Sequence, residues 1–249
     1  MIERTVLTFD TDWCPDFAID FVADVLVRNA VAATWFITHE SPAIGRLRRH
    51  PALFEIGIHP NFLPNSTHGD SPAAVLSNCF RLVPGARSAR NHGLAQSTPL
   101  LGEMMRAGVA VDVSLFLPGS SNLQPHAFRY YGNALLRVPY NWEDDYEMSQ
   151  PRRSWSFEGW NRGRPGLRVL DFHPIHVYLN APDIGGYDAI KRALKIPVGR
   201  VAQAAAEQHV NRTEGPRTFF EEAVAWLSRN GSARIADVES AWVAANGAP

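Results

Sequence analysis

Apolar and polar positions alternate along the chain in two different patterns. Short runs rich in Val, Phe and Thr, such as RTVLTFD at residues 4–10, are typical of buried strands. Between these runs lie segments with apolar residues about four positions apart, which is the spacing of a helix with one buried face. In the segment that follows Pro15, for example, Phe17, Phe21 and Val25 fall on one side. The alternation predicts parallel strands joined by helices.

The same unit repeats along the chain. We predict further strands in VAATWFITHE (31–40), ALFEIGIHP (52–60), GARSARNHG (85–93), VAVDVSLF (109–116), ALLRVPYNWEDD (134–145) and LRVLDFHPIHVYL (167–179). Further helices are predicted at 41–50, 72–83, 97–108 and 216–231, with Ser41 and Ser71 as N-caps and Gly108 and Gly231 as stops. Residues 180–216 are weakly patterned and indicate either a helical insertion or a lid.

Length and composition set the class of protein. A chain of 249 residues with 45% hydrophobic positions has enough material for one large α/β domain, and we expect residues 1–249 to form a single one. The net charge of −1 provides no basic surface for nucleic acid. No apolar run approaches the ~20 residues of a membrane span, and the N-terminus has no signal-peptide pattern. We therefore expect a cytoplasmic protein, with Cys14 and Cys79 as free thiols.

Polar side chains gather where the predicted strands end, which is where parallel α/β folds place functional residues. These residues are Asp10, Asp12, His59, Arg90, His92, Asp112, Glu143, Asp144, Asp145, His173 and His176. One Asp with two His ligands suits a catalytic divalent metal that keeps an open position for water, and this ligand type favours zinc. A second carboxylate that does not bind the metal can act as general base on that water.

The order of these motifs resembles that of the polysaccharide deacetylase superfamily, the NodB-homology carbohydrate esterases. TFDTD is similar to the family's first motif, Thr-Phe-Asp-Asp, with Thr11 inserted. FEIGIHP resembles the strand that carries the first metal histidine, ARSARNHG the arginine motif, and VLDFH the late strand that ends in a catalytic histidine. The resemblance covers residues 5–176 and implies a distorted, incomplete (β/α)7 barrel with parallel strands. It also implies a hydrolase that removes an acyl group from the nitrogen of an amino sugar or another N-acylated glycan.

The resemblance implies a role for several residues. Asp10 would be the general base, and Arg90 would hold it in place as an anion. His173 would be the general acid that protonates the leaving amine. Asp12 and His59 would bind the metal.

The third metal ligand departs from the family pattern. The family's second metal histidine follows the first by four residues, where this chain has Leu63. We expect His68 to take this place, because the turn-rich loop after His59 can fold back at little entropic cost. Asn61, His92 and His176 are the alternatives.

Other polar and aromatic residues are candidates for substrate contacts. Trp13 and Trp142 offer ring faces on which a sugar can stack, with core packing as the alternative. Asn61, His92, Glu143 and His176 lie in segments that we expect at the same rim. Asp112 either forms an ion pair with Arg90 or, like Asp171, raises the pKa of His173. A cytoplasmic location would favour a soluble amino-sugar precursor of surface polysaccharide.

Three other functions fit parts of the pattern. A haloacid-dehalogenase-type phosphatase also places Asp-x-Asp after its first strand, but it needs a mid-chain lysine, and the only lysines are Lys191 and Lys195. A glycosyltransferase that binds manganese through Asp-x-Asp would carry the motif later in the chain. A catalytically silent carbohydrate-binding protein, with the fold but no metal, is the third.

Overall fold

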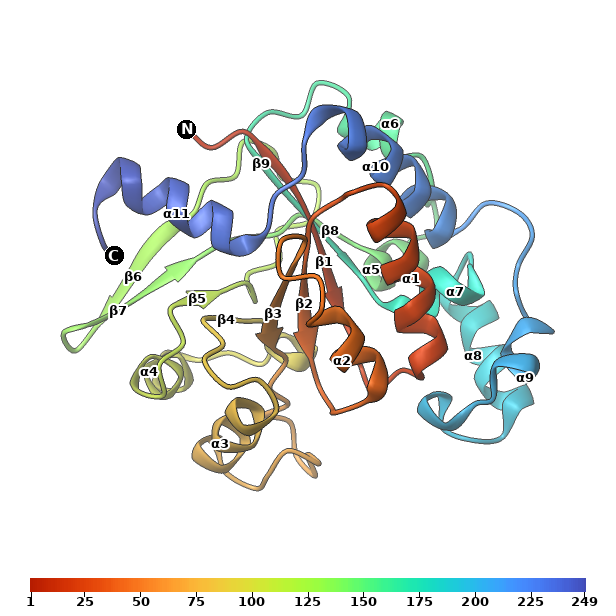
Figure 1. Cartoon of the computed structure of the whole chain (residues 1–249), viewed down its shortest axis with the longest axis horizontal. Coiled ribbons are helices and arrows are strands. Elements are labelled where there is room, and N and C mark those ends of the chain that lie inside the picture. The colour runs from red at the N-terminus through yellow and green to blue at the C-terminus, as the bar shows by residue number, and fades with distance from the viewer.

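One open, curled sheet organises the computed structural model, which describes residues 1–249 apart from the side chain of residue 198. Within the described chain the sheet has nine strands, in the order β6-β7-β5-β4-β3-β2-β1-β9-β8 (Figure 1). Their bounds are β1 (Arg4–Asp10), β2 (Ala33–Ile37), β3 (Phe54–Ile58), β4 (Ser88–Ala89), β5 (Val111–Asp112), β6 (His126–Tyr130), β7 (Asn133–Arg137), β8 (Trp142–Glu143) and β9 (Leu167–Phe172). All neighbours pair in parallel except the antiparallel hairpin β6–β7. The predicted incomplete α/β barrel is confirmed.

Helices follow most strands and pack on the sheet. They are α1 (Asp16–Arg28), α2 (Pro42–Leu47), α3 (Pro72–Leu82), α4 (Thr98–Arg106), α5 (Asp144–Ser149), α6 (Phe157–Asn161), α7 (Pro174–Leu179), α8 (Ile184–Leu194), α9 (Gln203–Glu207), α10 (Pro216–Asn230) and α11 (Ile235–Asn246), with short 3-10 turns at His92–Leu94 and Val198–Arg200. The predicted caps are confirmed, because the hydroxyls of Ser41 and Ser71 each accept a hydrogen bond from the backbone of their helix. None of the helices described has both the length and the apolar character needed to cross a bilayer.

Several predicted strands are too long. Those expected over 85–93 and 109–116 are reduced to Ser88–Ala89 and Val111–Asp112. The strand expected over 167–179 ends at Phe172, because Pro174 begins α7. Proline suits the first turn of a helix, where its missing N–H leaves no hydrogen bond unmade. The segment 134–145 likewise divides into β7, β8 and the start of α5. The helical character expected of 180–216 is confirmed, since α8 and α9 lie there.

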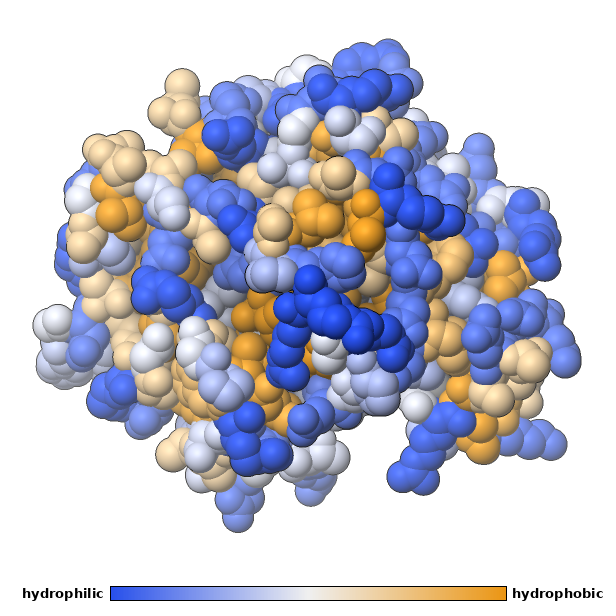
Figure 2. Space-filling model, in the orientation of Figure 1, coloured by the Kyte–Doolittle hydropathy of each residue, from blue (hydrophilic) through white to orange (hydrophobic). Residues whose placement is uncertain are grey.

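The core lies between the centre of the sheet and the helices α1, α7 and α10. Phe9 of β1 is fully buried, and its ring stacks on Trp35 with centroids 4.5 Å apart. The same ring meets the edge of Phe220 from α10. On the face of the molecule that Figure 2 shows, hydrophilic and hydrophobic side chains are interspersed. The packing of Phe9 holds β1 between its sheet neighbours β2 and β9, and the carboxyl ends of these parallel strands therefore meet at one edge.

Gly57, the fourth residue of β3, provides a test of the packing on the other face of the sheet, where Phe36 belongs to a second cluster of buried side chains. A Cβ atom at this position would lie 2.7 Å from the carbonyl oxygen of Ser88 and 2.8 Å from Cδ1 of Phe36. We expect Gly57→Ala to lower the free energy of unfolding by about 1–3 kcal/mol in urea titrations, the usual cost of overpacking. Gly45→Ala in α2 is the matched control, because its Cβ would meet nothing within 4 Å. Equal stability of the two variants would contradict this account.

Candidate active site

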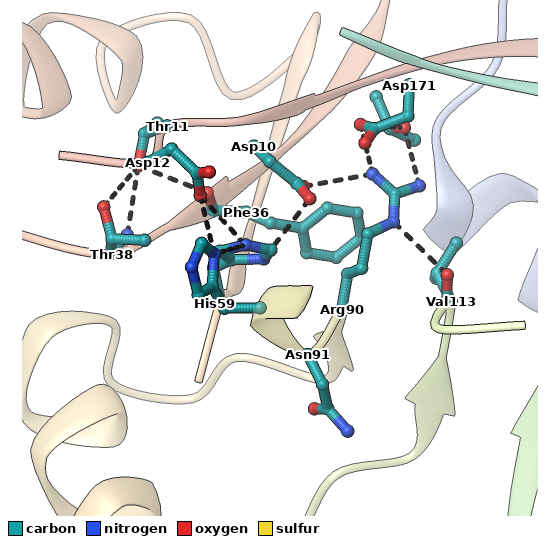
Figure 3. A network of polar contacts seen from close by, with 12 residues as sticks. Asp10, Thr11, Asp12, Phe36, Thr38, His59, Arg90, Asn91, Val113 and Asp171 are labelled. Carbon is teal, nitrogen blue, oxygen red and sulfur yellow. Dashed lines mark hydrogen bonds and ion pairs between the residues drawn. The ribbon is translucent and has the colours of Figure 1, made fainter. Parts of the chain in front are cut away.

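The carboxyl ends of β1, β3, β4 and β9 bring distant polar residues together (Figure 3). Asp10 is the last residue of β1, and His59 and Arg90 directly follow β3 and β4. Asp171 lies in β9, in register with Thr8 of β1. The pairing of these parallel strands therefore produces the convergence that the sequence predicts.

Asp12, His59 and His92 form a compact group of potential metal ligands. Asp12 Oδ1 lies 3.1 Å from His59 Nε2 and 3.1 Å from His92 Nδ1, and the two nitrogens are 3.3 Å apart. Ligands at about 2.0–2.2 Å from a tetrahedral zinc ion are roughly 3.3–3.5 Å apart, so this donor set fits such an ion. The other nitrogen of His59, Nδ1, faces Asp10 Oδ2 at 3.5 Å, and metal-bound histidines commonly have a carboxylate in this place.

His68 lies outside this group, contrary to our expectation. Its Nε2 donates to the carbonyl oxygen of Thr38 at 2.7 Å, and its Nδ1 accepts from the backbone N–H of Asn61 at 3.1 Å. Both ring nitrogens are therefore engaged in holding the loop after β3. Asn61 belongs to the same loop, where its side-chain oxygen accepts from the N–H of Leu63. The loop does fold back, but onto the end of β2, so His92 replaces His68 in the candidate ligand set.

Arg90 is fully buried and bonds two carboxylates (Figure 3). Its Nη1 donates to Asp10 Oδ1 at 3.0 Å and to Asp171 Oδ1, and its Nε donates to the carbonyl oxygen of Val113 at 3.2 Å. Burial raises the pKa of Asp10 to about 6 although the charge of Arg90 opposes the shift. The alternative ion pair between Arg90 and Asp112 is wrong, because Asp112 pairs with Arg137 at 2.8 Å.

His173 has a carboxylate partner that we did not predict. Its Nδ1 donates to Asp144 Oδ1 at 2.7 Å, and its backbone N–H donates to Asp144 Oδ2 at 2.7 Å. Burial alone would lower the pKa of His173, but Asp145 and Asp144 outweigh it and raise the pKa well above the usual value. Asp112 does not have this role, because it pairs with Arg137. Asp171 lies close enough for its charge to interact with that of His173, but it is not the main partner. The remaining nitrogen of His173, Nε2, faces Asp12 Oδ2 at 3.5 Å.

His176 lies one helical turn further on, behind this pair. It is buried in α7, and its Nδ1 lies 3.3 Å from Asp144 Oδ1 and 3.2 Å from Asp145 Oδ1. The edge of its ring meets Tyr187 of α8. His176 therefore lies behind Asp144, and the charges of Asp144 and Asp145 raise its pKa although burial opposes the shift.

The two tryptophans have different positions. The prediction that Trp142 is a platform for a sugar is wrong, because its side chain is buried and stacks on Phe219 with ring centroids 4.0 Å apart. Trp13 is partly exposed, and its ring centroid lies 5.3 Å from those of His68 and His92. Trp13 thus remains a candidate for substrate contact beside His92, one of the candidate metal ligands.

Glu143 lies at the end of β8, partly exposed. Its Oε2 accepts a hydrogen bond from the hydroxyl of Tyr140 at 3.2 Å. Burial, and then the charge of Asp171, raises the pKa of Glu143 to about 8. Glu143 is the one carboxylic acid among the predicted substrate contacts, and folding makes it a weaker acid.

An open α/β barrel with carboxylates and histidines at its strand ends agrees with the comparisons, which point to polysaccharide deacetylases. The family model of the WbmS-like polysaccharide deacetylases matches residues 7–191, and the chain belongs to this family. A crystal structure from Bordetella bronchiseptica, of a protein named as a polysaccharide deacetylase involved in O-antigen biosynthesis, is 33% identical. That match covers 90% of each chain with a TM-score of 0.74.

More distant structures share the fold alone. A protein from Mycobacterium smegmatis, named as a polysaccharide deacetylase, is 16% identical over 89% of this chain and 84% of its own, with a TM-score of 0.52. A 4-alpha-glucanotransferase from Thermococcus litoralis is 8% identical over 96% of this chain and 38% of its own, with a TM-score of 0.54. A search of the curated proteins found no significant match.

The raised pKa of Glu143 predicts a pH-dependent stability. Because its pKa rises from 4.5 to about 8 on folding, the folded chain keeps a proton here that the unfolded chain loses. This contribution to stability is complete below about pH 4.5 and is lost as the pH rises to about 8. In thermal unfolding, Glu143→Gln should therefore gain in Tm over the unchanged protein between about pH 5 and pH 8. A constant difference in Tm over this range would contradict the shift.

Proposed function

We propose that the protein is a metal-dependent hydrolase that removes an N-acetyl group from an amino sugar. Membership of the polysaccharide deacetylase family supports the reaction class. The observation that carries the proposal is the shared carboxylate of Asp12. Its Oδ1 faces His59 and His92, and its Oδ2 faces His173, so a candidate metal site and a candidate proton donor lie side by side.

Asp12, His59 and His92 would hold one divalent ion, and their nitrogen and oxygen donors suit zinc. When bound, the ion would supply Lewis acidity for the amide carbonyl and for water. Histidine binds a metal in its neutral form, and burial lowers the pKa of His59 accordingly. Three protein ligands leave a position open for water or substrate, as in catalytic zinc sites.

Asp10 would accept the proton of the attacking water. Arg90 fixes its Oδ1, while its Oδ2 lies on the side of His59. A pKa of about 6 keeps Asp10 ionised near neutral pH, yet basic enough to take a proton. The water oxygen then forms a bond to the carbonyl carbon, and its proton passes to the Asp10 carboxylate.

His173 would supply the second proton. An amine leaves an amide only when its nitrogen gains a proton, and the Nε2–H of a cationic His173 can donate one. Asp144 fixes the other ring nitrogen as a donor and favours this cation. As the C–N bond breaks, the proton of His173 passes to the amine nitrogen, and acetate and a free amino sugar are released.

The substrate is inferred from the relative in Bordetella bronchiseptica, which is named for O-antigen biosynthesis. We propose an N-acetylated hexosamine unit of a surface polysaccharide or of its nucleotide- or lipid-linked precursor. Trp13 and Glu143 would contact the sugar. Acetate release from a panel of such N-acetylhexosamines tests the proposal, and loss of the activity with a chelator and its return with zinc tests the metal. The cytoplasmic location stays a prediction.

The metal content of three variants tests the ligand set. We expect His92→Ala to lose its zinc on dialysis, because one of three ligands is gone. His68→Ala should keep the zinc, although it unfolds at lower temperature. Asp10→Asn should also keep the zinc while turnover falls about 10²–10⁴-fold, the usual contribution of a general base. Full zinc occupancy in His92→Ala, measured by atomic emission, would exclude this ligand set.

A comparison of substrates with different leaving groups tests the proposed role of His173 as general acid. His173→Ala should lose most amide hydrolysis, but it should lose less turnover of an activated aryl acetate, whose leaving group needs no proton. The ratio of the two rates in the variant and in the unchanged protein is the measurement. His176→Asn is the control, because it changes a side chain beside Asp144 and leaves His173, the proposed proton donor, in place. An equal loss on both substrates in His173→Ala would argue against the acid role.

A further inference from the structure

The backbone that carries Asp12 is strained. Asp12 and Trp13 have φ angles of +41° and +52°, in the left-handed region that residues with a side chain rarely adopt. Such residues persist only where the surrounding structure holds them, and they cluster at functional sites. Something must therefore hold this two-residue turn directly after β1.

Two threonine hydroxyls lie on either side of the strained turn. Thr11 precedes Asp12, and its Oγ1 accepts from the backbone N–H of Thr38 at 3.0 Å (Figure 3). Thr38 Oγ1 accepts from the N–H of Trp13 at 2.9 Å, and the two hydroxyls lie 3.0 Å apart. Both threonines are buried, with exposed fractions of 0% and 1%. The pair thus joins both flanks of Asp12 to the end of β2.

The hydrogen bonds of this turn differ from those of the regular pairing between β1 and β2. The regular ladder between β1 and β2 continues one step past Asp10, through the bond from the N–H of Thr11 to the carbonyl oxygen of Phe36 at 3.1 Å. Beyond that step, the Thr38 hydroxyl replaces a backbone acceptor for Trp13. The chain can then turn out of the strand, and Asp12 Oδ1 comes within 3.1 Å of both candidate metal histidines.

We infer that Thr11 and Thr38 are positioning residues, whose paired hydroxyls hold the Asp12 carboxylate in the geometry that a metal ion requires. The inference rests on the proposed metal site and adds to it residues that touch neither ion nor substrate. Loss of partners that orient a ligand typically lowers metal affinity by about 10–100-fold. The expected effect therefore falls on the affinity for zinc itself, before any turnover is measured.

Thr38→Val is the decisive variant, because valine has nearly the shape of threonine and carries a methyl group in place of the hydroxyl. Thr34→Val is its matched control. Thr34 is also fully buried in β2, and its hydroxyl donates to Glu55 at 2.8 Å and accepts from the N–H of Ile235 at 2.9 Å, at the other end of the strand. Both variants should lose thermal stability. Only Thr38→Val should lose zinc affinity, by about 10–100-fold in competition with a chromogenic chelator.

Thr38→Ser keeps the hydroxyl and should restore the affinity to within about threefold of the unchanged protein, well inside the loss expected for an orienting partner. If the unchanged protein binds no zinc, the proposed metal site is wrong, and this inference fails with it. If it binds zinc and folded Thr38→Val binds zinc equally well, the positioning role is wrong while the metal site stands. Should Thr38→Val not fold, Thr11→Val is measured in its place and is judged by the same criterion.

Discussion

The candidate site depends on the buried ion pairs that the guanidinium of Arg90 forms with Asp10 and Asp171. A charge without access to water is tolerated only with close partners, and here they come from β1 and β9, while Arg90 itself follows β4. The removal of one partner from such a buried pair typically costs about 3–5 kcal/mol. The same contacts that hold the strand ends together therefore orient Asp10, and stability and the chemistry of the proposed base are linked.

Asp12 connects this half of the site to the other half. One carboxylate oxygen faces the two candidate metal histidines, and the other faces His173, which Asp144 holds from behind. Asp144 is the first residue of α5, so the residues directly after β8 raise the pKa of a histidine after β9. The contacts from the two candidate metal histidines through Asp12 to His173 and Asp144 thus link residues that follow five strands, β1, β3, β4, β9 and β8.

Residues that end long, regular strands could be predicted from the sequence, because parallel pairing brings such ends to one edge. Asp10 and His59 belong to this group, whereas Arg90 follows the two-residue strand β4. That His92 and not His68 lies in the candidate ligand set could not be predicted from the sequence. It depends on whether the loop after β3 folds toward β2 or toward the other ligands. The hydrogen bonds of His68 with backbone groups of Thr38 and Asn61 hold this loop against the end of β2. Trp142 was equally undetermined, because its stacking partner Phe219 is distant in the chain.

The three candidate ligands follow β1, β3 and β4, and each belongs to a different connection of the sheet. An ion that binds only the folded chain would tie these connections together, and it would add to the free energy of unfolding by mass action, about 2.7 kcal/mol at a free concentration one hundred times the dissociation constant. The supply of metal in the cell would then set how long a folded molecule survives, as well as how fast it works.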